Sequence, residues 1–270
     1  MTNAMGNFSL GARSFWGLMV RDVRVLRREV APFCARTLMN PFMFVFVFTY
    51  LFPKMGQGFQ NSRGISFGTL ILPGLLAVAI FVQGIMAVAL PLSVEISSTR
   101  EIEDRVMSPL PVPWVAIQKI IFSAVQSVIA ALVVFPLIYF IPTSPVHVHV
   151  ESWPILIGTI ILASLASGAV GLTIGTIVKP QNIGLMFGIV VVPITFFGCV
   201  YYPWVFLEKI RWIQIAVLIN PLVYMSEGLR TALTPETPHM PAWTTTLALL
   251  LCVLILGWVG IRGFIRRVVS

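Results

Sequence analysis

The chain has 270 residues, of which 57% are hydrophobic and only 10% are charged, and its mean hydropathy is +0.93. Soluble domains carry about 25% charged residues, so this composition excludes an ordinary soluble enzyme or binding domain. The formal net charge of +8 is compatible with nucleic-acid binding, but the basic residues lie at the ends of apolar segments. That placement is typical of membrane topology, and we expect no nucleic-acid partner.

The first predicted element is a basic amphipathic helix over residues 15–30. Apolar residues recur along it at helical spacing, and four arginines occupy much of the remaining surface. Such a helix lies along a membrane surface, where it anchors the chain to anionic lipid and can also contact a cytoplasmic partner. We therefore assign residues 1–36 to an N-terminal region with this interfacial helix, and residues 37–270 to a membrane domain.

Six apolar segments follow, each close to the roughly 20 residues that cross about 30 Å of hydrocarbon. A spanning segment has to satisfy its own backbone hydrogen bonds, so we predict an all-α integral membrane protein with six transmembrane helices. Asn40-Pro41 interrupts the first segment. Gly171-x-x-x-Gly175 and Gly184-x-x-x-Gly188 predict close helix contacts, and we favour contacts within the chain over contacts between subunits. The predicted spans are residues 37–52, 69–94, 114–141, 153–178, 183–202 and 243–261.

The basic residues predict the orientation of these spans. Thirteen of the 18 lysines and arginines fall on one side, in the N-terminal region, the connections after the second and fourth spans, and the C-terminus. The positive-inside rule places that side in the cytoplasm, and both termini with it.

The connection after the second span is unusually charged for this chain, and it predicts a short helix over about residues 98–107, ended by prolines. Its carboxylates alternate with arginines outside the bilayer, which favours a solvated ion-pair surface over acid–base catalysis or metal binding. A short, rigid, charged helix between two spans is suited to receive force from another protein. The residues concerned are Arg100, Glu101, Glu103, Asp104 and Arg105.

The segment between the fifth and sixth spans is too apolar for a simple loop and too short for a soluble domain, so we expect it to dip into the membrane or lie on it. Glu227 and Arg230 are three residues apart and can pair on one helix face. The candidate residues of this segment are Tyr201, Tyr202, Pro203, Asn220, Pro221, Tyr224, Glu227 and Arg230.

Polar groups are rare within the predicted spans. Four of them either line a substrate path or hydrogen-bond to neighbouring helices: Gln83, Ser123, Gln126 and Ser127. His147-x-His149 with Glu151 has too few ligands for a clear metal site, so we expect none. The three cysteines lie in or beside apolar helices and are expected to be free thiols.

Two regions together make the chain similar to the membrane subunit of ABC-2 type ATP-binding-cassette exporters. One continues from Arg100-Glu101 to Ser108-Pro109-Leu110 and Lys119. The other continues from Gly198, through Tyr201-Tyr202-Pro203 in place of a more usual pair of phenylalanines, to Asn220-Pro221-Leu222-x-Tyr224-x-x-Glu227-Gly228-Leu229-Arg230. The spacing of spans and the basic N-terminal helix agree, so the resemblance covers nearly the whole chain.

This resemblance implies a permease that pairs with a second copy or a homologue in a bacterial cytoplasmic membrane. Two copies of a separate ATP-binding subunit would dock on the short charged helix, and residues 203–232 would form an extracytoplasmic re-entrant helical hairpin. The sequence G-x-x-x-x-G-K-[ST] is absent, so we expect no ATPase and no cofactor in this chain, with ATP and Mg²⁺ in the partner.

The sequence therefore predicts a permease of an ATP-driven exporter that moves an amphipathic or lipid-linked substrate. A drug-like molecule is the first choice and a lipid-linked glycan the second, because the path is apolar and nearly uncharged. A secondary transporter or channel is an alternative, but it calls for ionisable residues in mid-span. A lipid-modifying membrane enzyme is another, and it needs acids, histidines or metal ligands clustered at one membrane face.

Overall fold

The computed structural model describes residues 2–28, 30–51, 54–55, 67–96, 110–142 and 148–269. Within these ranges the secondary structure is helical and contains no strand, which confirms the all-α prediction. The charged connection with Arg100, Glu101, Glu103, Asp104 and Arg105 lies outside the described residues. The short helix expected over residues 98–107 therefore stays a prediction.

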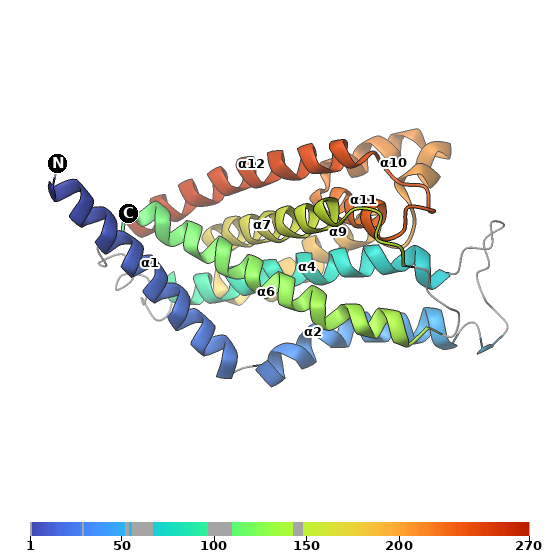
Figure 1. Ribbon diagram of the computed structural model, residues 1–270, viewed down its shortest axis with the longest axis horizontal. Helices are drawn as coiled ribbons and strands as arrows, with labels where there is room; N and C mark the ends of the chain where they lie inside the picture. Colours follow the sequence, from blue (N-terminus) through green and yellow to red (C-terminus); the bar gives the residue numbers. More distant parts are fainter. Residues whose placement is uncertain are drawn as a thin grey trace.

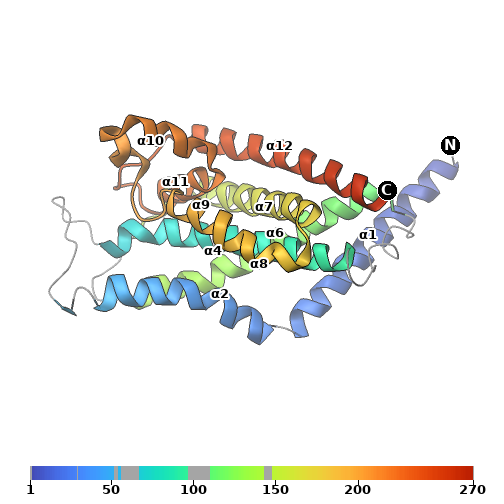
Figure 2. The ribbon, with the colours of Figure 1, turned by 180° about the vertical axis from the view of Figure 1, so that it is seen from behind.

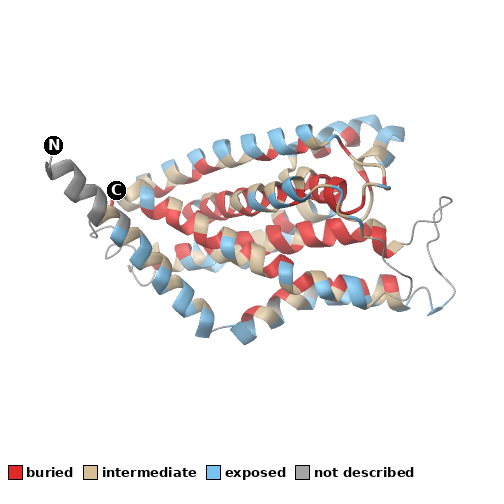
Figure 3. Ribbon diagram, in the orientation of Figure 1, coloured by how far each residue is buried: buried red, intermediate tan, exposed pale blue. Residues whose placement is uncertain are grey.

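Four long helices form the bundle: α4 (Phe67–Val94), α6 (Val112–Phe140), α7 (Trp153–Ile177) and α12 (Ala242–Val269). Helix α7 contacts each of the other three, and α4 also packs on α6 (Figure 1). Figure 3 shows buried residues concentrated on α4 and α7, whereas the outward side of α12 is exposed. This burial pattern follows from sequence, because α4 and α7 carry no Asp, Glu, Lys, Arg or His and are apolar on all sides.

Both chain termini lie at the same end of the bundle, which we call the termini end (Figures 1 and 2). Helix α1 (Thr2–Arg28) crosses this end obliquely, and Trp16 on it is 67% exposed. Residues 15–28 of the predicted amphipathic helix form the second half of this longer helix, whereas Val30 is the first residue of the next one. Polar contacts hold α1 to the bundle, among them the Gln118 Nε2 group, which donates to Asp22 Oδ2 over 2.9 Å.

The first span begins earlier than predicted. Helix α2 (Val30–Val45) continues into the π-helical segment η1 (Phe46–Leu51), so the apolar helix starts at Val30 and not at residue 37. The prediction placed the start after Arg36, but one basic residue near a helix end does not interrupt backbone hydrogen bonding. Pro41 lies inside α2, where it removes one backbone donor without ending the helix.

Five helices in the described part of the chain are long and apolar enough to cross a membrane, whereas the fifth predicted span, residues 183–202, is shorter than 18 residues in the structure. It ends at Phe196, not at residue 202, and a turn follows in which Cys199 has a φ of 52°. The segment consists of η3 (Pro180–Asn182), α8 (Ile183–Met186), η4 (Phe187–Val191) and α9 (Val192–Phe196).

One of the two predicted glycine contacts forms within the chain. A Cβ atom on Gly171 would lie 2.9 Å from the Ile85 carbonyl oxygen, and one on Gly175 would lie 3.0 Å from that of Ala89. These glycines therefore allow α7 to approach the backbone of α4 closely. The intramolecular contact predicted at Gly184 and Gly188 is wrong, because a Cβ on either would meet nothing within 4 Å.

A helical hairpin lies at the opposite end of the bundle, which we call the hairpin end. It consists of η5 (Trp204–Lys209), α10 (Arg211–Ala216), η6 (Val217–Ile219) and α11 (Pro221–Leu233). Helix α11 contacts α4, α7 and α12, and all of its residues from Met225 to Leu233 are buried. The hairpin thus covers the hairpin end of the bundle and leaves α11 inside it (Figure 2).

Candidate functional site

The helical path breaks at Asn220-Pro221, between η6 and α11. The Asn220 side chain accepts a hydrogen bond from Leu222 N over 2.9 Å and so caps α11, and Pro221 occupies the first helical position, where its missing N–H costs nothing. The same side chain donates from Nδ2 to the Ile194 carbonyl over 2.7 Å. Asn220 therefore fixes the start of α11 against α9.

Glu227 and Arg230 form the ion pair that their spacing predicts, and both side chains are fully buried. The Glu227 carboxylate also accepts two hydrogen bonds from the backbone of other segments. Trp204 N donates to Oε1 and Met240 N donates to Oε2, each over 2.9 Å. Arg230 donates from its NH2 group to the Cys199 carbonyl over 3.2 Å. The pair thus joins the turn after α9, helix α11 and the segment before α12. We call these five residues the clamp.

Further hydrogen bonds join the same segments as the clamp or lie next to it. The Ser226 hydroxyl donates to the Gly198 carbonyl over 2.7 Å, and that of Thr231 donates to the Met240 carbonyl over 3.0 Å. The Tyr224 hydroxyl donates to the Leu218 carbonyl over 2.8 Å, which holds η6 against α11. All three acceptors are backbone carbonyls, so these hydrogen bonds fix the path of the backbone around the clamp.

The aromatic-proline turn packs beside the clamp. Tyr201 lies 5.4 Å from Phe44 and 5.9 Å from Phe196, measured between ring centroids, and the Tyr202 hydroxyl donates to the Phe196 carbonyl over 3.4 Å. Pro203 is buried immediately before η5. All eight residues that the sequence singled out in this segment therefore lie together at the hairpin end.

A second buried ion pair lies at the termini end. Lys119 Nζ of α6 is 2.7 Å from Glu95 Oε2 at the end of α4, and the two side chains are only 8% and 10% exposed. These residues flank the charged connection on both sides. Sequence reasoning placed Lys119 inside α6 but missed its partner. The available signal was two opposite charges bracketing a short connection between adjacent spans.

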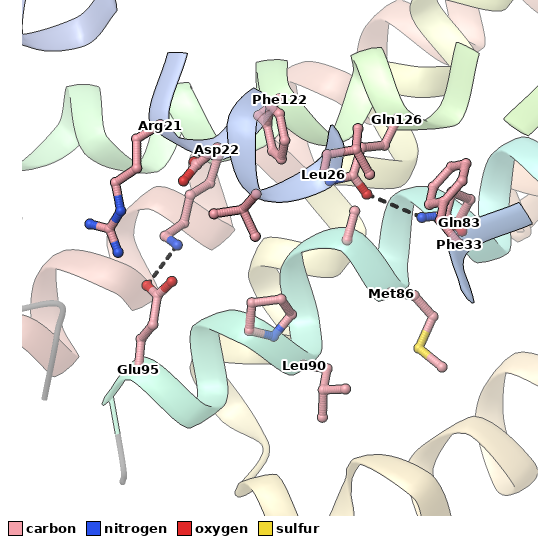
Figure 4. Close-up of a pocket in the computed structure, with 14 residues that line it drawn as sticks. Arg21, Asp22, Leu26, Phe33, Gln83, Met86, Leu90, Glu95, Phe122 and Gln126 are labelled. Carbon is pink, nitrogen blue, oxygen red and sulfur yellow. Dashed lines mark hydrogen bonds and ion pairs between the residues drawn. The ribbon is translucent and has the colours of Figure 1, made fainter. Parts of the chain in front are cut away.

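A cavity of about 490 Å³ opens beside this pair, between α1, α2, α4 and α6 (Figure 4). Two of the four polar residues predicted within the spans line it. Gln83 Nε2 donates to Gln126 Oε1 over 3.2 Å, and Gln83 Oε1 accepts from the Thr37 hydroxyl over 3.2 Å. The wall of the cavity therefore includes a hydrogen-bonded pair of amide side chains.

The other two predicted polar residues lie elsewhere, at the contacts between helices. The Ser123 hydroxyl donates to the Ile120 carbonyl of its own helix over 2.9 Å and lies against Gly168 of α7. Ser127 lies against Gly84 of α4, and its hydroxyl is buried without a hydrogen-bond partner among the described residues. Neither lines the cavity.

Metal-ligating side chains do not gather in the part of the chain that the structure describes, where no group of three or more His, Cys, Asp or Glu residues is placed to hold an ion. His147, one of the three candidates, lies outside the described residues. His149 is held through its backbone N–H, which donates to the Leu233 carbonyl over 3.0 Å.

An all-helical, multi-pass bundle with a buried clamp at its hairpin end and a cavity of about 490 Å³ beside the ion pair at its termini end has the architecture of a membrane permease. The family model of the ABC-2 type transporter matches residues 13–234, and the chain belongs to this family. Its members are transport subunits that normally work with an ABC ATP-binding subunit. No curated protein matches the chain.

Proposed function

We propose that this protein is the membrane-spanning half of an ATP-driven exporter in a bacterial cytoplasmic membrane. It pairs with a second copy or a homologous permease, and two ATP-binding subunits dock on the cytoplasmic face. The complex moves an amphipathic or lipid-linked substrate outward, with a drug-like molecule favoured over a lipid-linked glycan. The positive-inside rule assigns the termini end to the cytoplasm and the hairpin end to the outside.

The observation that supports export best is the difference between the two ends of the bundle. The cavity of about 490 Å³ lies beside the Glu95–Lys119 pair and α1 at the termini end, whereas the clamp of Glu227 and Arg230 ties together the segments at the hairpin end. Irregular backbone at membrane depth is tolerated where it is buried in protein, as the turn at Cys199 is. In this proposal the hairpin is re-entrant and forms the outer cap.

Energy enters through the charged connection in this account. When two ATP-binding subunits close on ATP, they push on the helix predicted over residues 98–107. The Glu95–Lys119 ion pair joins the ends of α4 and α6 on either side of that connection. A push is therefore transmitted to both helices together, and the cavity that they line changes its access.

The charge distribution supports an amphipathic substrate. Helices α4 and α7 carry no Asp, Glu, Lys, Arg or His over their whole lengths. A transporter driven by protons or sodium ions uses such residues in mid-span, where they are costly and functional. A substrate with a large apolar part needs none of them.

The direct experiment is affinity purification of the native complex from the membrane, followed by uptake of amphipathic fluorescent dyes into inside-out vesicles. The proposal expects a nucleotide-binding subunit to co-purify and the dyes to accumulate only with hydrolysable ATP. Purification without such a subunit, together with equal uptake in the absence of ATP, would overturn it.

A further inference from the structure

The cavity between α1, α2, α4 and α6 has four charged residues at one end, and their charges balance. Arg21 and Asp22 of α1, Glu95 after α4 and Lys119 of α6 line it, giving two acidic and two basic groups within one opening (Figure 4). All four take part in ion pairs or hydrogen bonds in the structure. A ligand with only a positive or only a negative charge meets two residues of the same charge here. A ligand that carries both charges can pair with the two acidic and the two basic residues.

The middle of the cavity is apolar. Leu26 of α1, Phe33 of α2 and Phe122 of α6 line it from one side, and Met86 and Leu90 of α4 line it from the other (Figure 4). These side chains come from four separate helices, so an apolar body placed among them is surrounded. Its burial is favourable because it removes apolar surface from water.

The other end of the cavity offers unused hydrogen-bond donors. The Gln126 side chain lines the cavity, and its Oε1 accepts from Gln83. Its amide nitrogen donates to no group in the described part of the chain, although it carries two N–H groups. A ligand with an oxygen acceptor at this depth satisfies a donor that the protein leaves open.

The size of the cavity limits the ligand. Lys119 at the charged end and Gln126 toward the other end are seven residues apart on α6, which corresponds to about 10 Å along a helix. A volume of about 490 Å³ lies within the range of small-molecule pockets. This space suits a drug-sized molecule and is too short for the long chain of a lipid-linked glycan.

We propose that this cavity is the cytoplasmic loading site for a drug-sized amphiphile of zero net charge. Its zwitterionic head lies among Arg21, Asp22, Glu95 and Lys119, its apolar body contacts Leu26 and Met86, and an oxygen acceptor at its far end reaches Gln126. This inference rests on the exporter function proposed above, and it narrows the substrate class from amphipathic molecules to zwitterionic ones.

Binding is tested first, without transport. Ala87 lines the cavity, so a cysteine at this position can report whether the cavity is occupied. The complete complex with Ala87→Cys is placed in vesicles, and the rate at which a maleimide labels the new cysteine is measured. Peptide mass distinguishes this cysteine from the native ones. Three probes with the same tail are compared: octylphosphocholine, octyltrimethylammonium and octyl sulfate. We expect octylphosphocholine to slow labelling at least fivefold and the two singly charged probes to slow it far less.

Val125→Cys is the matched control, because Val125 lies on α6 beside Gln126 but is 40% exposed and does not line the cavity. Its labelling stays unchanged with all three probes. Equal protection at both cysteines, no protection at Ala87→Cys, or stronger protection by either singly charged probe would overturn the inference.

The contact between the ligand and Gln126 is tested by a separate measurement. An octylphosphocholine with a hydroxyl at the end of its tail is expected to protect Ala87→Cys at about fivefold lower concentration than the plain probe, as one hydrogen bond provides. Adding Gln126→Leu removes that preference and leaves protection by the plain probe in place. A preference that survives Gln126→Leu contradicts the assignment of the donor.

Transport separates this inference from the exporter function. Ala87→Trp fills the cavity and is expected to lower ATP-dependent uptake of octylphosphocholine into inside-out vesicles at least tenfold, whereas Val125→Trp leaves it unchanged. If the native complex shows no ATP-dependent uptake, the exporter function fails even where binding is seen. If the native complex transports the probe and Ala87→Trp does so equally well, the loading site is wrong and the exporter function stands.

Discussion

The carboxylate of Glu227 and the guanidinium of Arg230 are paired inside α11 with no exposed side-chain surface on either residue. The carboxylate also accepts backbone N–H groups from positions 23 residues before it and 13 residues after it. Removing one partner of a buried ion pair leaves an uncompensated charge and costs about 3–5 kcal/mol. The clamp therefore makes the conformation of the whole hairpin end depend on two residues.

Replacing Glu227 by glutamine is expected to lower the free energy of unfolding by about 3–5 kcal/mol, because Arg230 then stays buried without its counter-ion. Unfolding of the purified protein, followed by circular dichroism, measures the change. Glu208→Gln is the control: Glu208 is exposed on η5, where a charge contributes about 1 kcal/mol or less. Equal effects of the two substitutions would contradict the clamp.

A second prediction concerns the contact between α4 and the turn after α9. A Cβ atom on Gly74 would lie 2.0 Å from the Val200 carbonyl oxygen, so Gly74→Ala forces these backbones apart. Overpacking of this kind costs about 1–3 kcal/mol, and the same unfolding measurement detects it. Gly158→Ala on α7 is the matched control, since its new methyl group meets nothing within 4 Å. A Gly74→Ala protein as stable as Gly158→Ala would disprove the close approach.

A third prediction tests the ion pair beside the charged connection. Lys119→Met is expected to lower transport at least tenfold while ATP hydrolysis continues, because Glu95 then no longer joins α4 to α6. The exchanged pair, Glu95→Lys with Lys119→Glu, restores part of the transport, since it keeps the attraction but alters the other contacts of both residues. Transport and hydrolysis are measured on the same vesicles. An exchanged pair as inactive as Lys119→Met would rule out a coupling role.

The charged connection itself supplies a fourth prediction. A triple alanine variant of Arg100, Glu101 and Arg105 is expected to insert into the membrane normally but to lose co-purification of the ATP-binding subunit and ATP-driven transport. A triple alanine variant of Glu208, Lys209 and Arg211, all exposed at the hairpin end, is the control and keeps the subunit bound. Unchanged transport in the first variant would count against docking at this connection.

The sequence was sufficient to predict where most of the long helices lie, but not all of their ends, and it also predicted one local contact of the site. Hydropathy located the spans, because long apolar helices are the one way this chain can satisfy its backbone in lipid. Residue spacing also predicted the Glu227–Arg230 pair, which lies within one turn of one helix.

The contacts that complete the site join distant segments, and residue spacing carries no signal for them. The backbone partners of Glu227 at Trp204 and Met240 depend on how the hairpin folds back onto α12. The same holds for the division of the predicted path residues into Gln83 and Gln126 at the cavity and two serines at helix contacts. For the Glu95–Lys119 pair, the one signal was the position of two opposite charges on either side of a short connection. Tertiary packing decides each of these.

Reconstitution into liposomes tests the central claim, that this chain is a pathway whose energy comes from a separate ATPase. The purified permease is compared with and without its ATP-binding subunit, and outward movement of octylphosphocholine and of a fluorescent amphipathic dye is measured with ATP present. The account predicts transport only when the subunit is present and ATP is hydrolysed. Full-rate transport by the permease alone, with no nucleotide hydrolysis, would contradict it.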